Sequence, residues 1–168
     1  MVEIVFAADG LPADKPGRYA AVHQSLAAVI AGEPSLIARY ATAVSLLVQA
    51  FAPRFFWTGF YLVDPARGDE LVVGPYSGTL GCLRIPFGKG VCGAAALKGE
   101  TILVPDVHAF PGHIACDSRS RSEIVVPVFD SSARLVAVLD VDSAEPDAFD
   151  ADDQAGLEAL CADLLTLP

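Results

Sequence analysis

The sequence is poor in basic residues: its 168 residues include 11 lysines and arginines against 21 aspartates and glutamates, a formal net charge of −10. Because proteins bind nucleic acids by neutralising phosphates with Lys and Arg, this deficit argues against a nucleic-acid partner. The chain also lacks a run of about 18 apolar residues, the length that a membrane helix needs. Its start, MVEIVFAADG, has no basic segment followed by an apolar stretch. We therefore expect no secretory signal, no membrane contact and a cytoplasmic location.

Cysteine is also scarce, with four residues in the chain. In a reducing cytoplasm such cysteines are expected to be free, catalytic or metal-bound, and a disulfide between them would be transient. With 53% hydrophobic and 19% charged residues, the composition is typical of a globular protein. At this length one hydrophobic core suffices, so we expect a single domain over residues 1–168, with a loosely ordered N-terminal extension at 1–15.

Hydrophobic periodicity predicts the secondary structure. Helices are expected at residues 16–31, 33–51 and 150–166, with a short one at 93–99, and strands at 54–63, 70–76, 101–104, 122–129 and 134–141. The polar segment 105–121 is long for a loop, and long loops are often functional. Neighbouring hairpin-like strand pairs predict an α+β fold, in which a central antiparallel sheet has helices on one face and pocket loops on the other.

The segment GCLRIPFGKGVCG, residues 81–93, fits three patterns. GKGVCG matches the dinucleotide-binding motif G-x-G-x-x-G, but that motif needs a preceding parallel strand, and CLRI is a poor strand. The two cysteines are too far apart for a single zinc knuckle. A zinc site assembled from distant loops stays open as an alternative. Its ligands would be Cys82, Cys92, Cys116, His108 and His113.

In the third pattern, one thiolate reacts and a second thiol resolves the oxidised product as a disulfide. Three of the four cysteines lie in Gly-rich or polar segments, where a thiol is reachable. Cys161 differs, because LEALCADLLTL places it among leucines at helical spacing. We expect Cys161 to be a buried and unreactive thiol.

Three acidic residues gather on the last predicted hairpin. If its DSSA turn closes symmetrically, Glu123 lies opposite Asp140, with Asp142 as the diagonal neighbour. The opposite face is apolar and expected to be core; it carries Ile124, Val126, Val128, Leu135, Ala137, Leu139 and Val141. A solvated sheet edge would explain the three acids. The functional alternative is that close carboxylates raise one another's pKa, which places a proton donor beside acceptors for a cationic group.

Four motifs follow one another along the chain: FWTGFYL (56–62), GCLRIPFGKGVCG (81–93), DVHAFPGHIACDSRSRSEIVVPV (106–128) and VLDVDS (138–143). With them, nearly the whole sequence closely resembles the free methionine-(R)-sulfoxide reductases, a family of single-domain GAF proteins. The resemblance implies a GAF-like fold. It also implies an oxidoreductase that reduces free L-methionine-(R)-sulfoxide to L-methionine, an activity connected with oxidative stress.

The resemblance also implies roles for individual residues. Cys116 would be the nucleophile, Cys82 the resolving thiol and Cys92 an auxiliary cysteine. Trp57 would form an aromatic wall of the substrate site, although its area alone would make it a core residue. The substrate-site carboxylates would be Glu123, Asp140 and Asp142.

In the implied reaction a cysteine sulfenic acid and then an intramolecular disulfide form, and thioredoxin, with its reductase and NADPH, restores the thiols. No bound cofactor and no metal are expected. Relatives are often dimeric, so a homodimer is an alternative to a monomer. Two other functions compete: a GAF module that binds and reports a small ligand, and a redox-sensing or zinc-binding scaffold. A purely binding pocket, however, has no need of a resolving thiol.

Overall fold

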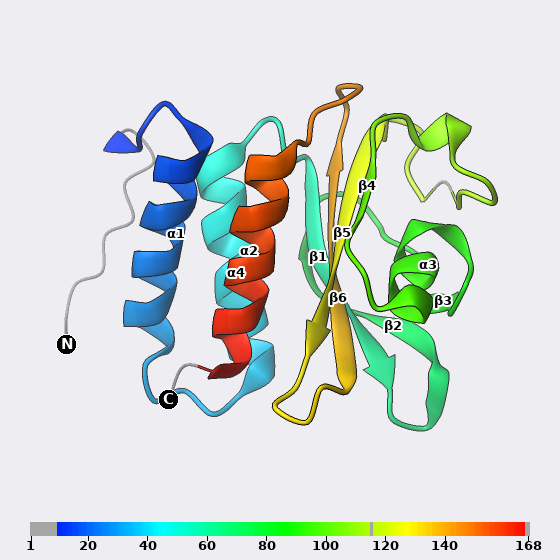
Figure 1. The fold of residues 1–168 in the computed structure, drawn as a ribbon, viewed down its shortest axis with the longest axis horizontal. Coiled ribbons are helices and arrows are strands. Elements are labelled where there is room, and N and C mark those ends of the chain that lie inside the picture. The colour runs from blue at the N-terminus through cyan, green and yellow to red at the C-terminus, as the bar shows by residue number, and fades with distance from the viewer. Residues whose placement is uncertain (1–9, 115, 167–168) are drawn as a thin grey trace.

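The computed structural model, which describes residues 10–114 and 116–166, is built around a six-stranded sheet with helices on both faces (Figure 1). The strand order is β3-β2-β1-β6-β5-β4, and all neighbouring strands are antiparallel. This arrangement confirms the predicted fold class. Of the N-terminal extension expected at residues 1–15, residues 1–9 lie outside the described part of the chain.

Three long helices cover one face of the sheet (Figure 1). They are α1 (Lys15–Ile30), α2 (Leu36–Phe51) and α4 (Ala151–Thr166), close to the predicted ranges. The side chains of Asp14 and Ser35 accept hydrogen bonds from the first turns of α1 and α2, which satisfies amide groups that a helix start leaves unpaired. None of the described helices has the length and apolar character needed to cross a membrane.

The strands are β1 (Trp57–Asp64), β2 (Arg67–Ser77), β3 (Arg84–Pro86), β4 (Ile102–Val104), β5 (Ser122–Phe129) and β6 (Leu135–Ser143). Five of them match predicted strands. Strand β3 was not predicted, because it has three residues and pairs only with β2 at the sheet edge. Such an edge tolerates Pro86, which has no amide hydrogen to donate.

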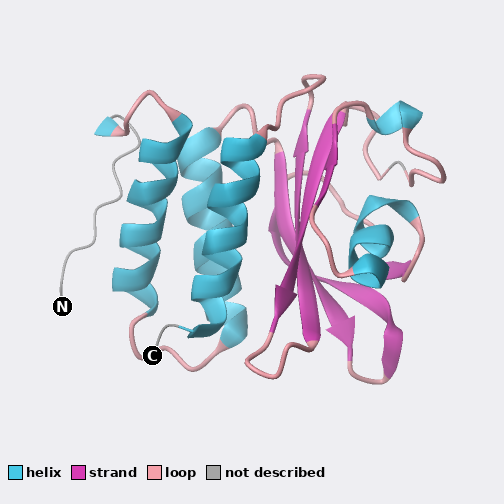
Figure 2. Ribbon diagram, in the orientation of Figure 1, coloured by secondary structure: helices cyan, strands magenta, loops and turns pink. Residues whose placement is uncertain are grey.

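The other face of the sheet carries the short helix α3 (Gly90–Lys98), the 3-10 turn η2 (Val107–Ala109) and the connecting loops (Figure 2). Two hydrophobic clusters result, one on each side of the sheet. Alternation along β1 divides its side chains between them, since Phe60 packs toward the long helices while Trp57 and Tyr61 pack toward α3.

The G-x-G-x-x-G pattern has a structural explanation in this fold. Gly88 and Gly90 have φ angles of 78° and 60°, in the left-handed region that favours glycine. A Cβ atom on Gly93 would lie 2.4 Å from the carbonyl oxygen of Pro86. These glycines therefore allow the chain to turn sharply into α3 and to approach β3 closely, and β3, the strand directly before them, is antiparallel to its neighbour β2.

The predicted register of the β5–β6 hairpin is wrong by two residues. Glu123 lies directly opposite Asp142, and Asp140 lies opposite Val125, so Asp140 is the diagonal neighbour of Glu123. A shift of two residues preserves the side-chain alternation, so all three acids remain on one face of the sheet.

The turn and a β-bulge cause the shift. The amide groups of Ser132 and Arg134 donate to the Asp130 carboxylate, and the Asp130 amide donates to the Arg134 carbonyl, so Phe129 pairs with Leu135 and the register moves by one residue. A bulge between Val128 and Phe129 adds the second residue. Because a bulge reverses alternation locally, Leu135 packs on the α3 side and not in the core under the long helices, where it was expected.

Candidate active site

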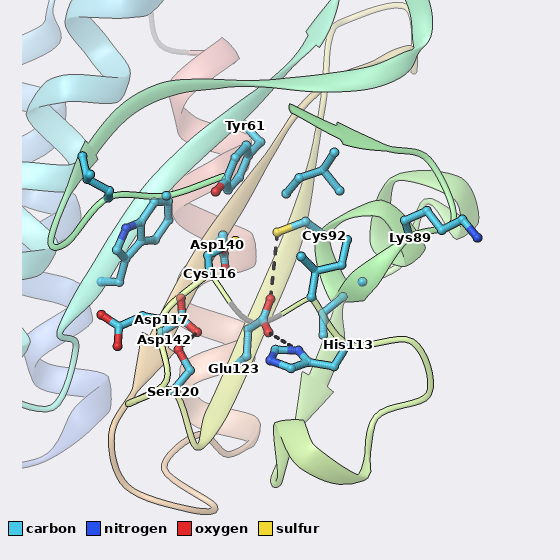
Figure 3. A pocket seen from close by; sticks show the side chains of 17 residues that line it. Tyr61, Lys89, Cys92, His113, Cys116, Asp117, Ser120, Glu123, Asp140 and Asp142 are labelled. Carbon is cyan, nitrogen blue, oxygen red and sulfur yellow. Dashed lines mark hydrogen bonds and ion pairs between the residues drawn. The ribbon is translucent and has the colours of Figure 1, made fainter. Parts of the chain in front are cut away.

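A small pocket lies on the α3 side of the sheet and encloses about 40 Å³ (Figure 3). Its walls come from β1, the loop before β3, the first turn of α3, the loop that follows η2, and strands β5 and β6. The structure brings the seven candidate site residues together here, although they are spread along most of the chain. Six of them line the pocket: Trp57, Cys92, Cys116, Glu123, Asp140 and Asp142. The seventh, Cys82, is bonded to Cys116.

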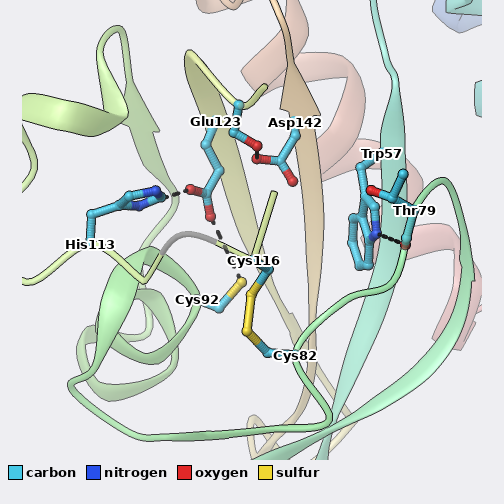
Figure 4. The surroundings of a disulfide bond; sticks show 9 residues. Trp57, Thr79, Cys82, Cys92, His113, Cys116, Glu123 and Asp142 are labelled. Carbon is cyan, nitrogen blue, oxygen red and sulfur yellow. Dashed lines mark hydrogen bonds and ion pairs between the residues drawn. A yellow bond between two sulfur atoms is a disulfide. The ribbon is translucent and has the colours of Figure 1, made fainter. Parts of the chain in front are cut away.

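A disulfide joins Cys82, on the loop between β2 and β3, to Cys116, on the loop before β5 (Figure 4). The two Cα atoms are 5.8 Å apart across a sequence separation of 34 residues. Cys116 is exposed, whereas Cys82 is half-buried. Cys161 is buried on α4, on the opposite side of the sheet, which confirms its predicted burial.

The third pocket cysteine, Cys92, is free and buried in the first turn of α3. Its Sγ atom lies 3.9 Å from Oε1 of Glu123. Burial raises the pKa of the Cys92 thiol well above its usual value, and the carboxylates of Asp140 and Glu123 raise it further. Cys92 is therefore held as a neutral thiol and is a poor nucleophile.

The three carboxyl groups form one cluster along β5 and β6. Burial raises the pKa of Glu123 well above its usual value, and the nearby charges of Asp140 and Asp142 raise it further. Burial and the charge of Asp142 likewise raise the pKa of Asp140 well above its usual value. Asp142 has a pKa of about 6, raised by burial and restrained by a 2.7 Å hydrogen bond that the Ser120 hydroxyl donates. The surroundings thus favour the protonated forms of Glu123 and Asp140 more than that of Asp142.

Little positive charge compensates the cluster. Nδ1 of His113 lies 4.0 Å from Oε2 of Glu123, but burial lowers the pKa of His113, which favours the neutral ring. Two buried polar atoms in this pocket have no hydrogen-bond partner among the described residues: Oδ1 of Asp140 and Nδ1 of His113. An unsatisfied buried polar atom costs about 1–3 kcal/mol. The pocket is therefore suited to a polar or cationic ligand that supplies the missing partners.

A cation is one such ligand. The ligand atoms of Cys92, Glu123 and Asp140 all lie within 4.8 Å of one another and could share a metal ion. This group differs from the zinc alternative considered from the sequence, since Cys82 and Cys116 are bonded to each other. An ammonium group suits the same acidic surroundings.

An aromatic stack lies beside the acids, because Trp57 on β1 pairs directly with Asp142 on β6. The Trp57 ring lies between Tyr61, at a centroid distance of 5.7 Å, and Tyr76, at 5.3 Å. The indole Nε1 donates a 2.9 Å hydrogen bond to the carbonyl oxygen of Thr79. Tyr61 lines the pocket but was not predicted as a site residue. Strand alternation was the signal that could have identified it, because positions 57, 59 and 61 share one face of β1.

A polar link connects the two loops that carry the disulfide. The Thr79 hydroxyl donates to the Asp117 carboxylate, which also accepts hydrogen bonds from the Arg119 guanidinium. The Arg119 guanidinium holds the pKa of Asp117 well below its usual range. It also lies 5.0 Å from the centre of the Phe56 ring. Because Asp117 already neutralises it, Arg119 is not available to stabilise a Cys116 thiolate.

Comparison with known proteins identifies the family. A family model described as a GAF domain matches residues 39–165. The free methionine-R-sulfoxide reductase of Escherichia coli is 41% identical over 146 residues, which cover 87% of this chain and 86% of that protein. The free methionine-R-sulfoxide reductase of Saccharomyces cerevisiae is 40% identical over 132 residues, which cover 77% of this chain and 73% of that protein. The chain belongs to the free methionine-(R)-sulfoxide reductase family of GAF domain proteins.

A solved structure of this reductase family is similar over nearly the whole chain. The free methionine-R-sulfoxide reductase of Neisseria meningitidis, in complex with its substrate, superposes with a TM-score of 0.88 at 46% identity. The match covers 98% of this chain and 93% of that one. The GAF fold therefore extends over both layers of the molecule, from the long helices to the pocket face.

Proposed function

We propose that this protein reduces free L-methionine-(R)-sulfoxide to L-methionine through thiol chemistry. The observation that carries the proposal is the joining of a redox-active pair and an acid cluster in one pocket, with the Cys82–Cys116 disulfide beside Glu123, Asp140 and Asp142. The relatives from E. coli and S. cerevisiae, which are named free methionine-R-sulfoxide reductases, support it. So does the substrate complex of the N. meningitidis protein.

In the proposed reaction the Cys116 thiolate attacks the sulfoxide sulfur, because Cys116 is the half of the pair that lines the pocket. The attack forms a transient bond between the two sulfur atoms while the sulfoxide oxygen gains a proton. The hydroxyl group then passes to the Cys116 sulfur, the S–O bond of the substrate and the transient S–S bond break, methionine leaves, and Cys116 becomes a sulfenic acid. The Cys82 thiol then attacks the Cys116 sulfur, water leaves, and the disulfide forms. An external dithiol, for which we propose thioredoxin with its reductase and NADPH in a reducing cytoplasm, restores both thiols.

The acid cluster would supply the proton and bind the substrate amine. Glu123 and Asp140 are buried and have raised pKa values, so a neutral carboxyl is present at neutral pH to protonate the sulfoxide oxygen. Asp142, with a pKa of about 6, is largely ionised at pH 7 and would hold the substrate ammonium. A methionine inside a protein chain has no ammonium group, which accounts for a preference for the free amino acid.

The aromatic stack would bind the methyl-thioether part of the substrate. Sulfur and methyl groups pack favourably on aromatic faces, and Trp57 presents such a face to the pocket. None of these steps requires a metal ion.

The test offers the separate R and S epimers of free methionine sulfoxide to the purified protein with thioredoxin, thioredoxin reductase and NADPH. We expect NADPH consumption with the R epimer, little with the S epimer, and none for Cys116→Ser. A peptide containing methionine-(R)-sulfoxide should be a poor substrate. Equal turnover of both epimers, or no turnover by the unchanged protein, would contradict the proposal.

A further inference from the structure

The loop that carries Cys82 exposes two leucines. Leu80 and Leu83 are 83% and 75% exposed, more than any other large apolar side chain in the described residues. On the second loop, Ile114 is 40% exposed and precedes Cys116 by two residues. Single exposed apolar residues are common on proteins, but several around one reactive bond indicate an interaction surface. We call Leu80, Leu83 and Ile114 the disulfide rim.

Two arginines near the disulfide rim are already paired. Arg84, next to Leu83, forms ion pairs with Asp64 and Glu70. Arg119 is paired with Asp117, next to Cys116. Both arginine charges beside the exposed leucines are therefore balanced by carboxylates. Covering the leucines removes apolar area from water without burying an unpaired arginine, which favours association.

We propose that the disulfide rim is the docking surface for a protein dithiol reductant of the thioredoxin class. This proposal rests on the proposed function, because that function requires the Cys82–Cys116 disulfide to be reduced in every cycle. Small redox interfaces of this kind bury little area and are transient. A few apolar side chains at their centre then carry most of the binding energy. A small thiol gains nothing from such side chains, whereas a protein surface does.

The chemistry that follows docking is thiol–disulfide exchange. A reductant thiolate attacks one sulfur of the Cys82–Cys116 bond, that bond breaks, and the other sulfur leaves as a thiolate that takes up a proton. The second reductant thiol then attacks the mixed disulfide. The two electrons pass to Cys82 and Cys116, and the reductant is released as its own disulfide.

The test compares a protein reductant with a small one. Leu83 does not line the pocket, so Leu83→Ser should leave the dithiothreitol-supported rate and the KM for methionine sulfoxide unchanged. With thioredoxin, kcat/KM for the reductant should fall about fivefold to tenfold, the effect of losing one central apolar contact. Leu83→Met, which keeps an apolar side chain, should retain most of the thioredoxin rate.

The matched control is Ile37→Ser, because Ile37 is 52% exposed but lies on α2, on the far side of the sheet (Figure 1). It should change neither rate. An unchanged thioredoxin rate for Leu83→Ser would overturn the proposal. An equal loss of rate with thioredoxin and with dithiothreitol would also overturn it, because the substitution would then impair the reaction itself and not the docking of thioredoxin.

A second measurement separates this proposal from the proposed function. Reduced thioredoxin, with thioredoxin reductase and NADPH, is mixed with the disulfide form of the protein without any sulfoxide, and one NADPH is consumed per disulfide in a single turnover. This rate should fall for Leu83→Ser even if free methionine sulfoxide proves not to be the substrate. Failure of the epimer assay with a normal single turnover would contradict the proposed function and leave the docking surface supported.

Discussion

Replacing Asp142 with asparagine should stabilise the fold while impairing activity. Asp142 lies directly opposite Glu123 on the paired strands, and its charge raises the pKa of both Glu123 and Asp140. An asparagine side chain would keep the shape and the oxygen that accepts the Ser120 hydrogen bond, but it would carry no charge. A site that gathers buried acids for function does so at the expense of stability.

The size of the expected stabilisation follows from the pKa of Asp142. Because this pKa rises from its usual 3.8 to about 6 in the folded protein, ionising the group there costs about 3 kcal/mol more than in the unfolded chain, at about 1.4 kcal/mol per pH unit. A raised acid pKa means that the folded state binds more protons. The free energy of unfolding therefore falls as pH rises from about 4 to about 6 and stays lower above that.

The Asp142→Asn variant escapes this loss, so at pH 8 its free energy of unfolding should exceed that of the unchanged protein by about 1–3 kcal/mol. For a protein of this size a gain of about 2 kcal/mol raises Tm by about 4–8 °C. Below pH 4, where the carboxyl is protonated in both states, the two proteins should differ little.

Thermal unfolding in buffers from pH 4 to pH 8 tests this expectation, with Asp69→Asn as the matched control because Asp69 is exposed on β2. The control should show no pH-dependent gain. A gain of equal size at pH 4 and pH 8, or a lower Tm for Asp142→Asn at pH 8, would refute the assignment of Asp142 as a destabilising buried acid.

Three further predictions concern the thiols, the aromatic wall and the pocket volume. Iodoacetamide should modify Cys116 in the reduced native protein and leave the buried Cys92 and Cys161 unmodified, as peptide mass spectrometry would show; rapid labelling of Cys161 would contradict its packing. Gly59→Ala should displace the Trp57–Tyr76 stack and raise the KM for methionine sulfoxide at least about tenfold, since the added Cβ would lie 2.3 Å from Cβ of Tyr76 and 2.7 Å from the indole ring; an unchanged KM in a folded variant would argue against this stack as part of the substrate site. Methionine should bind more weakly to the disulfide form than to the reduced form, because the Cys82–Cys116 bond fixes Cys116 in the wall of a narrow pocket, and calorimetry showing equal affinity for both forms would disprove this.

The helices and five of the strands could be predicted because their hydrophobic periodicity is local. The hairpin register could not, since it depends on how the Asp130 side chain bonds to the turn and on one bulge. Glu123, Asp140 and Asp142 nevertheless lie on one face of the sheet, as predicted. The turn and the bulge each shift the register by one residue, and a total shift of two residues preserves the side-chain alternation.

The candidate site was predictable in its composition but not in its physical state. Sequence motifs named the acids and the cysteines, yet the burial of Cys92 and the unsatisfied oxygen of Asp140 arise from packing between β6 and α3. Tyr61 was overlooked because a tyrosine on a predicted strand is usually core. Alternation along β1 places it on the same face as Trp57, on which its ring stacks in the pocket.

The pocket draws its two kinds of chemical group from different parts of the fold. The acids lie on β5 and β6, which are paired on both sides, whereas Cys82 and Cys116 lie on loops. In the proposed reaction, the sulfur atoms can therefore change position between thiol, sulfenic acid and disulfide while the proposed proton donors stay fixed. Under the same proposal, changes in loop length would alter the rate at which the disulfide is reduced, and changes on the acid strands would separately alter which sulfoxide is bound.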